Sequence, residues 1–182
     1  MGPRRRALRI ATAALHRRLD HQLGSLSDRA AYARYLRIMT AFRGSVESEF
    51  QRRFGGCKLQ PQSIWPELCM DCCDLQLGVP QSGDALELRD QTEDYLGAFY
   101  VLEGSSLGAA VLWKRAHALG LNAEFGARHL ALQTSDRANW PAFQRHLEAC
   151  EDVNVDALNI AAEKVFAFAL RVAEDVENVD QG

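Results

Sequence analysis

The stretch that decides the fold is residues 95–112, YLGAFYVLEGSSLGAAVL, which has the most unusual composition in the chain. Its apolar residues recur every three or four positions, and this period predicts an α-helix. The stretch nevertheless contains Gly97, Gly104 and Gly108, each of which costs about 1 kcal/mol relative to alanine inside a helix. Because they are seven and four residues apart, all three glycines are expected on one side of the helix, where they leave a strip of bare backbone.

Two physical explanations fit this strip. Another helix could pack very closely against it, or a flat ligand could lie on the backbone while the glycines supply clearance and a bend. Ser105 and Ala109 border the strip and are also small. Spacing alone favours the packed helix, because such patterns of small residues are common.

The first predicted helix, residues 7–23, offers a candidate metal ligand. His16 stands beside its apolar stripe, Arg9 lies seven residues earlier on almost the same face, and Asp20 follows one turn later. A neutral imidazole binds transition metals, and a carboxylate on its other ring nitrogen fixes the tautomer. A surface histidine–aspartate pair without function explains the same spacing.

Helical periodicity continues through most of the chain. It predicts helices over residues 28–53, from Pro66 to Leu75, over 88–119, over 137–150, and a last one marked by residues from Leu158 to Val176. Residues 55–65 are expected to form a loop and residues 120–135 an irregular segment. No alternating β-branched stretch predicts a strand. We therefore expect the all-α class, as one irregular helical bundle.

Composition restricts the class of protein further. A chain of 182 residues that is 47% hydrophobic fits a single domain, residues 1–182. A net charge of −3 argues against a nucleic-acid partner, although arginines in the first 18 residues form a basic cluster that suits an acidic ligand or redox partner. No secretory or membrane-spanning apolar run is recognised, so we expect a cytoplasmic protein with no membrane partner. Five cysteines, including the pair Cys69 and Cys72, predict neither a disulfide framework nor a zinc site.

Two motifs taken together resemble a known family. Residues 11–16, ATAALH, resemble the first-helix motif of the heme oxygenases, and residues 100–108, YVLEGSSLG, resemble the distal-helix motif of their bacterial branch. The order and separation of the motifs also match, and the likeness extends over most of the chain. Within this family, the chain is most similar to the small bacterial enzymes associated with bacteriophytochromes.

The resemblance implies that heme is both prosthetic group and substrate, held between the first helix and a glycine-kinked distal helix. His16 corresponds to the proximal iron ligand, and the distal catalytic positions are Gly104, Ser105 and Gly108. Positions that correspond to further heme contacts are Arg9, as a propionate partner, Asp20, Tyr100 and Ala109.

The chain departs from the family pattern at several of these positions. Ala109 replaces a usual glycine and Ala110 a polar or basic residue, which we expect to narrow the distal pocket or shift the helix. Ser105 stands where many members have an aspartate that organises distal water. Gln144 stands where many have a basic propionate contact, and the neighbouring Arg145 is a possible replacement.

The resemblance implies oxidative cleavage of heme by O2 to biliverdin, carbon monoxide and ferrous iron. Because the chain lacks a G-x-G-x-x-G motif after a strand, electrons are expected from an external ferredoxin or flavin reductase. A bacteriophytochrome is a candidate acceptor of the biliverdin.

The main alternative is a heme carrier or sensor that does not cleave the ring, and Ala109 and Ala110 favour it. A di-iron bundle is disfavoured because the chain has no Glu-x-x-His pair, and a purely helical interaction protein is a further alternative.

Overall fold

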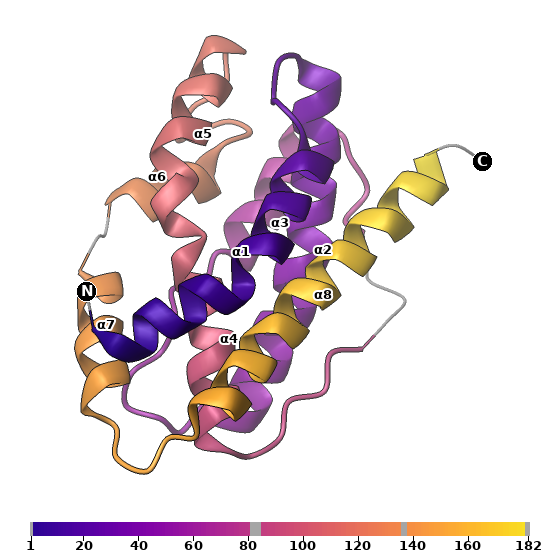
Figure 1. Ribbon diagram of the computed structural model, residues 1–182. Coiled ribbons are helices and arrows are strands. Elements are labelled where there is room, and N and C mark those ends of the chain that lie inside the picture. The colour runs from indigo at the N-terminus through magenta and orange to yellow at the C-terminus, as the bar shows by residue number, and fades with distance from the viewer. Residues whose placement is uncertain (1, 81–84, 136–137, 181–182) are drawn as a thin grey trace.

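A computed structural model describes residues 2–80, 85–135 and 138–180. These residues form eight α-helices and no strand, which confirms the all-α prediction (Figure 1). In chain order the helices are α1 (Pro3–Leu23), α2 (Arg29–Phe54), α3 (Trp65–Asp74), α4 (Thr92–Gly104), α5 (Ser106–Ala118), α6 (Arg128–Ser135), α7 (Asn139–Ala149) and α8 (Val155–Asp180).

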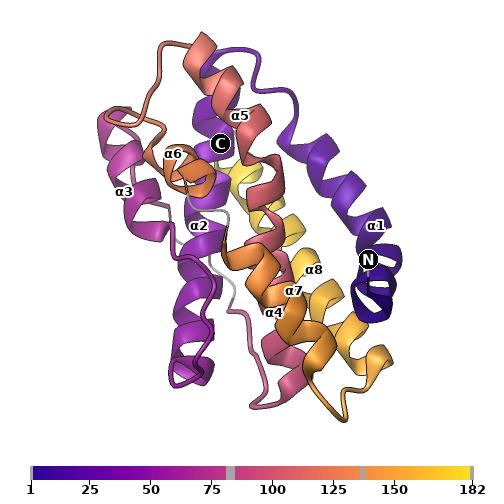
Figure 2. The same cartoon turned by 90° about the vertical axis from the view of Figure 1, so that its left-hand side faces the viewer.

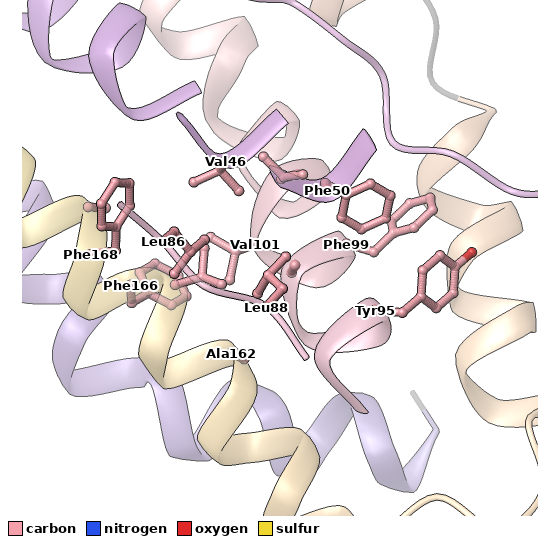
Figure 3. Packing of buried hydrophobic residues seen from close by; sticks show 14 of the residues in the cluster. Val46, Phe50, Leu86, Leu88, Tyr95, Phe99, Val101, Ala162, Phe166 and Phe168 are labelled. Atoms are coloured by element: carbon pink, nitrogen blue, oxygen red, sulfur yellow. The ribbon is translucent and has the colours of Figure 1, made fainter. Parts of the chain in front are cut away.

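The main hydrophobic core lies between α2, α4 and α8, and α8 also supports α1. Figure 3 shows aromatic and aliphatic side chains from these three helices meeting one another, with Leu86 and Leu88 of the preceding segment added. Phe99 of α4 stacks on Phe143 of α7, with ring centroids 4.5 Å apart. Burial of large apolar side chains of this kind is the main favourable contribution to folding.

A second core cluster joins α2 to α3, α5 and α6. Tyr32 and Leu36 of α2, Leu68 of α3, Ala109 of α5 and Leu130 of α6 are all fully buried in it. Helix α2 therefore contributes to both clusters and holds the two ends of the bundle together.

The predicted single helix over 88–119 is wrong in two respects. It begins at Thr92, because residues 85–89 form no helix and the Leu88 amide donates to Glu49 Oε1 at 3.0 Å. It is also interrupted at Ser105, which separates α4 from α5.

The predicted irregular segment over 120–135 is also wrong in part, because it contains α6. The carboxylate of Asp71 in α3 accepts hydrogen bonds from the Arg128 and His129 amides at 2.9 and 3.1 Å. A carboxylate at this position satisfies amides that the first turn of a helix leaves unpaired. The predicted start of the next helix at residue 137 lies outside the described residues, and α7 begins at Asn139.

Helix α1 begins at Pro3, four residues before its predicted start. Its first turn and the last turn of α7 form hydrogen bonds with each other. The Glu148 carboxylate accepts hydrogen bonds from the amides of Arg4 and Arg5, at 3.4 and 3.0 Å. In return the Arg4 guanidinium donates to the Leu147 and Glu148 carbonyls at 2.9 and 3.1 Å. Each helix therefore satisfies unpaired backbone groups at the end of the other.

One helical stretch, Thr92–Ala118, is long and apolar enough by length and composition to cross a membrane. Its most apolar window has a mean hydropathy of 1.3, and 44% of that window is buried inside the fold. Buried core helices of water-soluble proteins meet the same criterion, so this is weak evidence for a membrane span.

Candidate functional site

His16 is an exposed imidazole with one ring nitrogen engaged. Its Nδ1 lies 2.9 Å from Asp20 Oδ2, and its side chain is 59% exposed. Among the described residues, Nε2 has no hydrogen-bond partner. The ring lies 5.7 Å from that of Phe166 in α8. A carboxylate on Nδ1 holds the tautomer in which Nε2 is free to bind a metal.

The contacts of α8 place His16 near the level at which α4 ends. The Asn154 amide, just before α8, donates to Glu93 in the first turn of α4 at 2.9 Å, and further along Gly97 meets Ala161. The two helices therefore run parallel. Phe166 lies five residues beyond Ala161, so the imidazole beside it lies at about the level of the break between α4 and α5. Figure 2 shows α1 along one side of the molecule, with α4 and α5 in the middle and α3 on the far side.

The three glycines occupy two different environments. A Cβ added at Gly97 would lie 2.8 Å from both the Ala161 Cβ and the Ala162 nitrogen of α8. At Gly104 it would meet only Trp140, at 4.0 Å, and at Gly108 nothing within 4 Å among the described residues. Gly97 therefore serves close helix packing, whereas Gly104 and Gly108 present bare backbone to open space. Close helix packing therefore explains Gly97, and a flat ligand remains the explanation to be tested for Gly104 and Gly108.

Gly97 and Gly104 lie seven residues apart on α4, whereas Gly108 lies on α5, beyond the interruption at Ser105. Beyond the interruption, Leu107 and Val111 of α5 are 59% and 55% exposed, although both are large apolar residues. They lie on the same helix as Gly108. This part of α5 therefore offers an apolar surface on which no described segment packs closely.

Two predicted site residues do not face this surface. Ala109 is fully buried in the second core cluster, on the side of α5 that packs toward α2 and α6. The Ser105 hydroxyl donates to the Leu102 carbonyl at 2.7 Å and accepts from Gln133 Nε2 at 3.2 Å, so it is engaged inside the protein. Ala109 cannot narrow a pocket on the open side, and Ser105 does not present its hydroxyl there.

A cluster that the sequence did not reveal links α1 to the end of α4. The Arg5 guanidinium lies 5.5 Å from the centre of the Trp140 ring in α7. With its amide turned so that the oxygen faces these donors, Gln144 accepts from Arg5 Nη1 at 2.7 Å and from Trp140 Nε1 at 2.8 Å. Tyr100 of α4 is half-buried, and its ring lies 5.9 Å from that of Trp140.

Arg9 differs from Arg5 in its surroundings. It is exposed and has no hydrogen-bond or ion-pair partner among the described residues. Gln144, which replaces an expected basic residue on α7, is the residue that holds Arg5. Arg5 and Arg9 of α1 are therefore cationic groups that an acidic ligand could meet, and Arg145 of α7 is also exposed.

A second histidine, His129, lies fully buried between α2, α3 and α6. Its Nδ1 lies 2.7 Å from Asp71 Oδ2, and its Nε2 lies 3.2 Å from the Tyr35 hydroxyl. Burial lowers the pKa of His129 below its ordinary value of 6.5, although the Asp71 carboxylate opposes this shift. Both ring nitrogens are engaged, so the residue has no free nitrogen for a ligand.

Other candidate sites are weaker. Within the described ranges, no three His, Cys, Asp or Glu side chains gather as a metal cluster, and all five cysteines are free thiols. A hollow of about 800 Å³ lies on the other flank of α1, lined by Arg17, Arg18, His21 and Arg34 among others, and it contains none of the predicted site residues.

Comparisons with known proteins bear on the family and the fold of the chain. No protein-family model matches the chain. The chain is 32% identical over 169 residues to the heme oxygenase PigA of Pseudomonas aeruginosa, covering 87% of this chain and 84% of that protein. Its fold superposes on the crystal structure of the NO- and CO-bound heme oxygenase of Neisseria meningitidis with a TM-score of 0.70, at 25% identity, covering 93% of this chain and 89% of that one.

Proposed function

The chain belongs to the heme oxygenase family, and we propose that it degrades heme with His16 as the iron ligand and the backbone of Gly104 and Gly108 on the opposite side of the macrocycle. Heme degradation is the activity that its named relatives carry. The observation that carries the residue assignment is the pairing of a histidine that has one free nitrogen with two glycines whose missing side chains leave open space.

The residues present fit a heme on three counts. The Asp20 carboxylate on Nδ1 leaves Nε2 of His16 available, as is usual for histidines that bind metals. Gly108 and Gly104 leave room for a flat ring. Exposed Leu107 and Val111 supply an apolar surface that a porphyrin would cover.

Each of these residues has a distinct part in the proposal. Asp20 orients the imidazole and fixes its tautomer. The glycines let the backbone approach the ring closely and keep side chains from displacing a small ligand there. Phe166 supports the His16 ring from the core side. When bound, heme supplies the iron at which O2 reacts and the ring carbon that is oxidised.

Heme carries two carboxylates, and α1 supplies the cations that would meet them. Arg9 has no other partner among the described residues, and Arg5 is held rigidly against Trp140 and Gln144. A guanidinium pairs with a carboxylate through two parallel hydrogen bonds. We propose that both arginines bind the carboxylate edge, and that Arg5 replaces the basic residue that the sequence lacks at Gln144.

The products of this proposal are biliverdin, carbon monoxide and ferrous iron, formed with O2 and electrons from an external ferredoxin or flavin reductase. A bacteriophytochrome is the proposed acceptor of biliverdin, and the cytoplasm the proposed location.

The argument for a carrier that leaves the ring intact rested on Ala109 and Ala110. Because Ala109 is buried away from the open side, it no longer supports that alternative.

The decisive experiment follows the fate of heme. The purified protein is mixed with hemin, a ferredoxin or flavin reductase system with its reductant, and air, and the absorption spectrum is recorded. We expect loss of the Soret band and appearance of biliverdin, whose isomer is identified by chromatography. A stable heme spectrum under these conditions would show a carrier instead.

A further inference from the structure

One of the most deeply buried charges among the described residues lies behind the site. Arg43 of α2 is only 1% exposed, and every nitrogen of its guanidinium has a partner. Its Nε donates to Glu47 Oε1 at 2.6 Å, Nη1 to the Leu102 carbonyl at 3.0 Å, and Nη2 to the Gln62 carbonyl at 2.6 Å. An arginine is rarely buried this completely unless its charge and all its donors are satisfied.

The bond to Leu102 reaches the point where α4 ends. In an uninterrupted helix, the Leu102 carbonyl would accept from the amide four residues later, that of Ser106. Among the backbone bonds of the described residues, that bond is not formed. The carbonyl accepts instead from Arg43 Nη1 at 3.0 Å and from the Ser105 hydroxyl at 2.7 Å.

A second buried charge, the Glu103 carboxylate, fixes the end of α4 to the loop at Gln62 and to α7. The Glu103 carboxylate is 4% exposed, and its Oε1 accepts from the Gln62 amide at 2.5 Å and from Asn139 Nδ2 at 2.8 Å. Gln62 is therefore bound through its carbonyl by Arg43 and through its amide by Glu103. The end of α4 is thus fixed to α2, to the loop at Gln62 and to α7.

We propose that Arg43 is a positioning residue that sets where the glycine-containing helix breaks, and so places the bare backbone of Gly104 and Gly108 against the heme. This inference rests on the proposed function for its consequence in catalysis. A simple stabilising ion pair with Glu47 would not require the bonds that Arg43 makes to Leu102 and Gln62. Those bonds compensate for the helical hydrogen bond that is lost at the break.

The test uses Arg43→Lys, which keeps the charge but has a single ammonium that cannot span three acceptors in different directions. Arg52→Lys is the matched control, since Arg52 lies on the same helix and pairs with Glu49, but is 58% exposed. Amide hydrogen exchange is measured on both apo proteins. We expect exchange in a peptide covering residues 101–108 to rise about tenfold in Arg43→Lys, with little change in residues 93–98 or in the control.

The same variants are then given hemin and a reductase system, and the biliverdin isomers are separated. We expect the isomer ratio to change in Arg43→Lys and to stay unchanged in Arg52→Lys. A general loss of stability would lower the yield but leave the ratio the same. Unchanged exchange at residues 101–108, exchange that rises equally across the whole chain, or an unchanged isomer ratio would each overturn the proposal.

If Arg43→Lys does not fold, Ser105→Ala removes the other donor to the Leu102 carbonyl without exposing a buried charge. It is expected to raise exchange over the same residues by a smaller factor, and unchanged exchange would overturn the proposal. If the unmodified protein releases no biliverdin, the proposed function fails. The exchange measurements on the apo proteins still decide whether Arg43 holds the break.

Discussion

The protein contains two histidine–aspartate pairs of nearly the same geometry in opposite environments. In the His16–Asp20 pair the Nδ1–Oδ2 distance is 2.9 Å and both side chains are more than half exposed. In the His129–Asp71 pair it is 2.7 Å and both are fully buried. The two pairs differ at the second ring nitrogen. Nε2 of His129 contacts the Tyr35 hydroxyl, whereas Nε2 of His16 has no hydrogen-bond partner among the described residues. A histidine–aspartate contact alone therefore does not identify a ligand site.

The comparison predicts its largest effect at His16. In His16→Ala the iron would lose its proposed protein ligand, so turnover should fall by more than the 10- to 100-fold that loss of a supporting partner costs. The measurement is biliverdin formation, together with the Soret spectrum of the hemin complex. His21→Ala, on the same helix and also exposed, is the control and should retain activity. Normal turnover in His16→Ala without added imidazole would remove the central assignment.

In the buried pair, a substitution should lower the stability of the fold and leave hemin binding unchanged. Asp71→Asn takes a charged acceptor away from the amides of Arg128 and His129 and from the His129 ring. We expect the free energy of unfolding to fall by about 2 to 3 kcal/mol, as measured by urea denaturation. Hemin binding by the folded fraction should be unchanged. A variant of wild-type stability with an altered heme spectrum would place His129, and not His16, near the iron.

A pH series sharpens the contrast. Because the pKa of His129 is lowered in the fold, the unfolded chain binds a proton at this residue more readily than the folded chain does. The free energy of unfolding should therefore decrease as pH falls below about 6.5, by at most about 1.4 kcal/mol per pH unit. His129→Gln should show a shallower decrease over the same range. Identical slopes in the two proteins would mean that His129 is not held neutral.

The smallest effect is expected at the exposed carboxylate. Asp20→Asn keeps a hydrogen-bond acceptor near His16 Nδ1 but loses the charge, so activity should fall by about tenfold or less, at the low end of the range for supporting partners. Stability should barely change, in contrast to Asp71→Asn. Kinetics and urea denaturation of the two variants, measured side by side, test the comparison directly. A loss of stability equal to that of Asp71→Asn would contradict it.

Sequence periodicity predicted most helices but failed where a helix depends on distant residues. The first turn of α6 is bound by Asp71 of α3, and that of α1 by Glu148 of α7, and both helix starts were missed or placed late. At the break at Ser105, the Leu102 carbonyl accepts a hydrogen bond from Arg43 of another helix. These are tertiary contacts, so no local pattern in the sequence could have revealed them.

The candidate site divides in the same way. His16 and Asp20 are neighbours on one helix, so their spacing predicted their contact. The glycine spacing predicted bare backbone, but only the packing of α8 distinguishes Gly97 from Gly108. Arg5 and Trp140 come from helices far apart in sequence and became evident only in the fold.

The mutual capping of α1 and α7 makes position 2 sensitive to substitution. A side chain at Gly2 would collide with the carboxylate of Glu148 that receives the first amides of α1. Gly2→Ala would therefore have to move this carboxylate away from those amides and so loosen the start of the helix that carries His16.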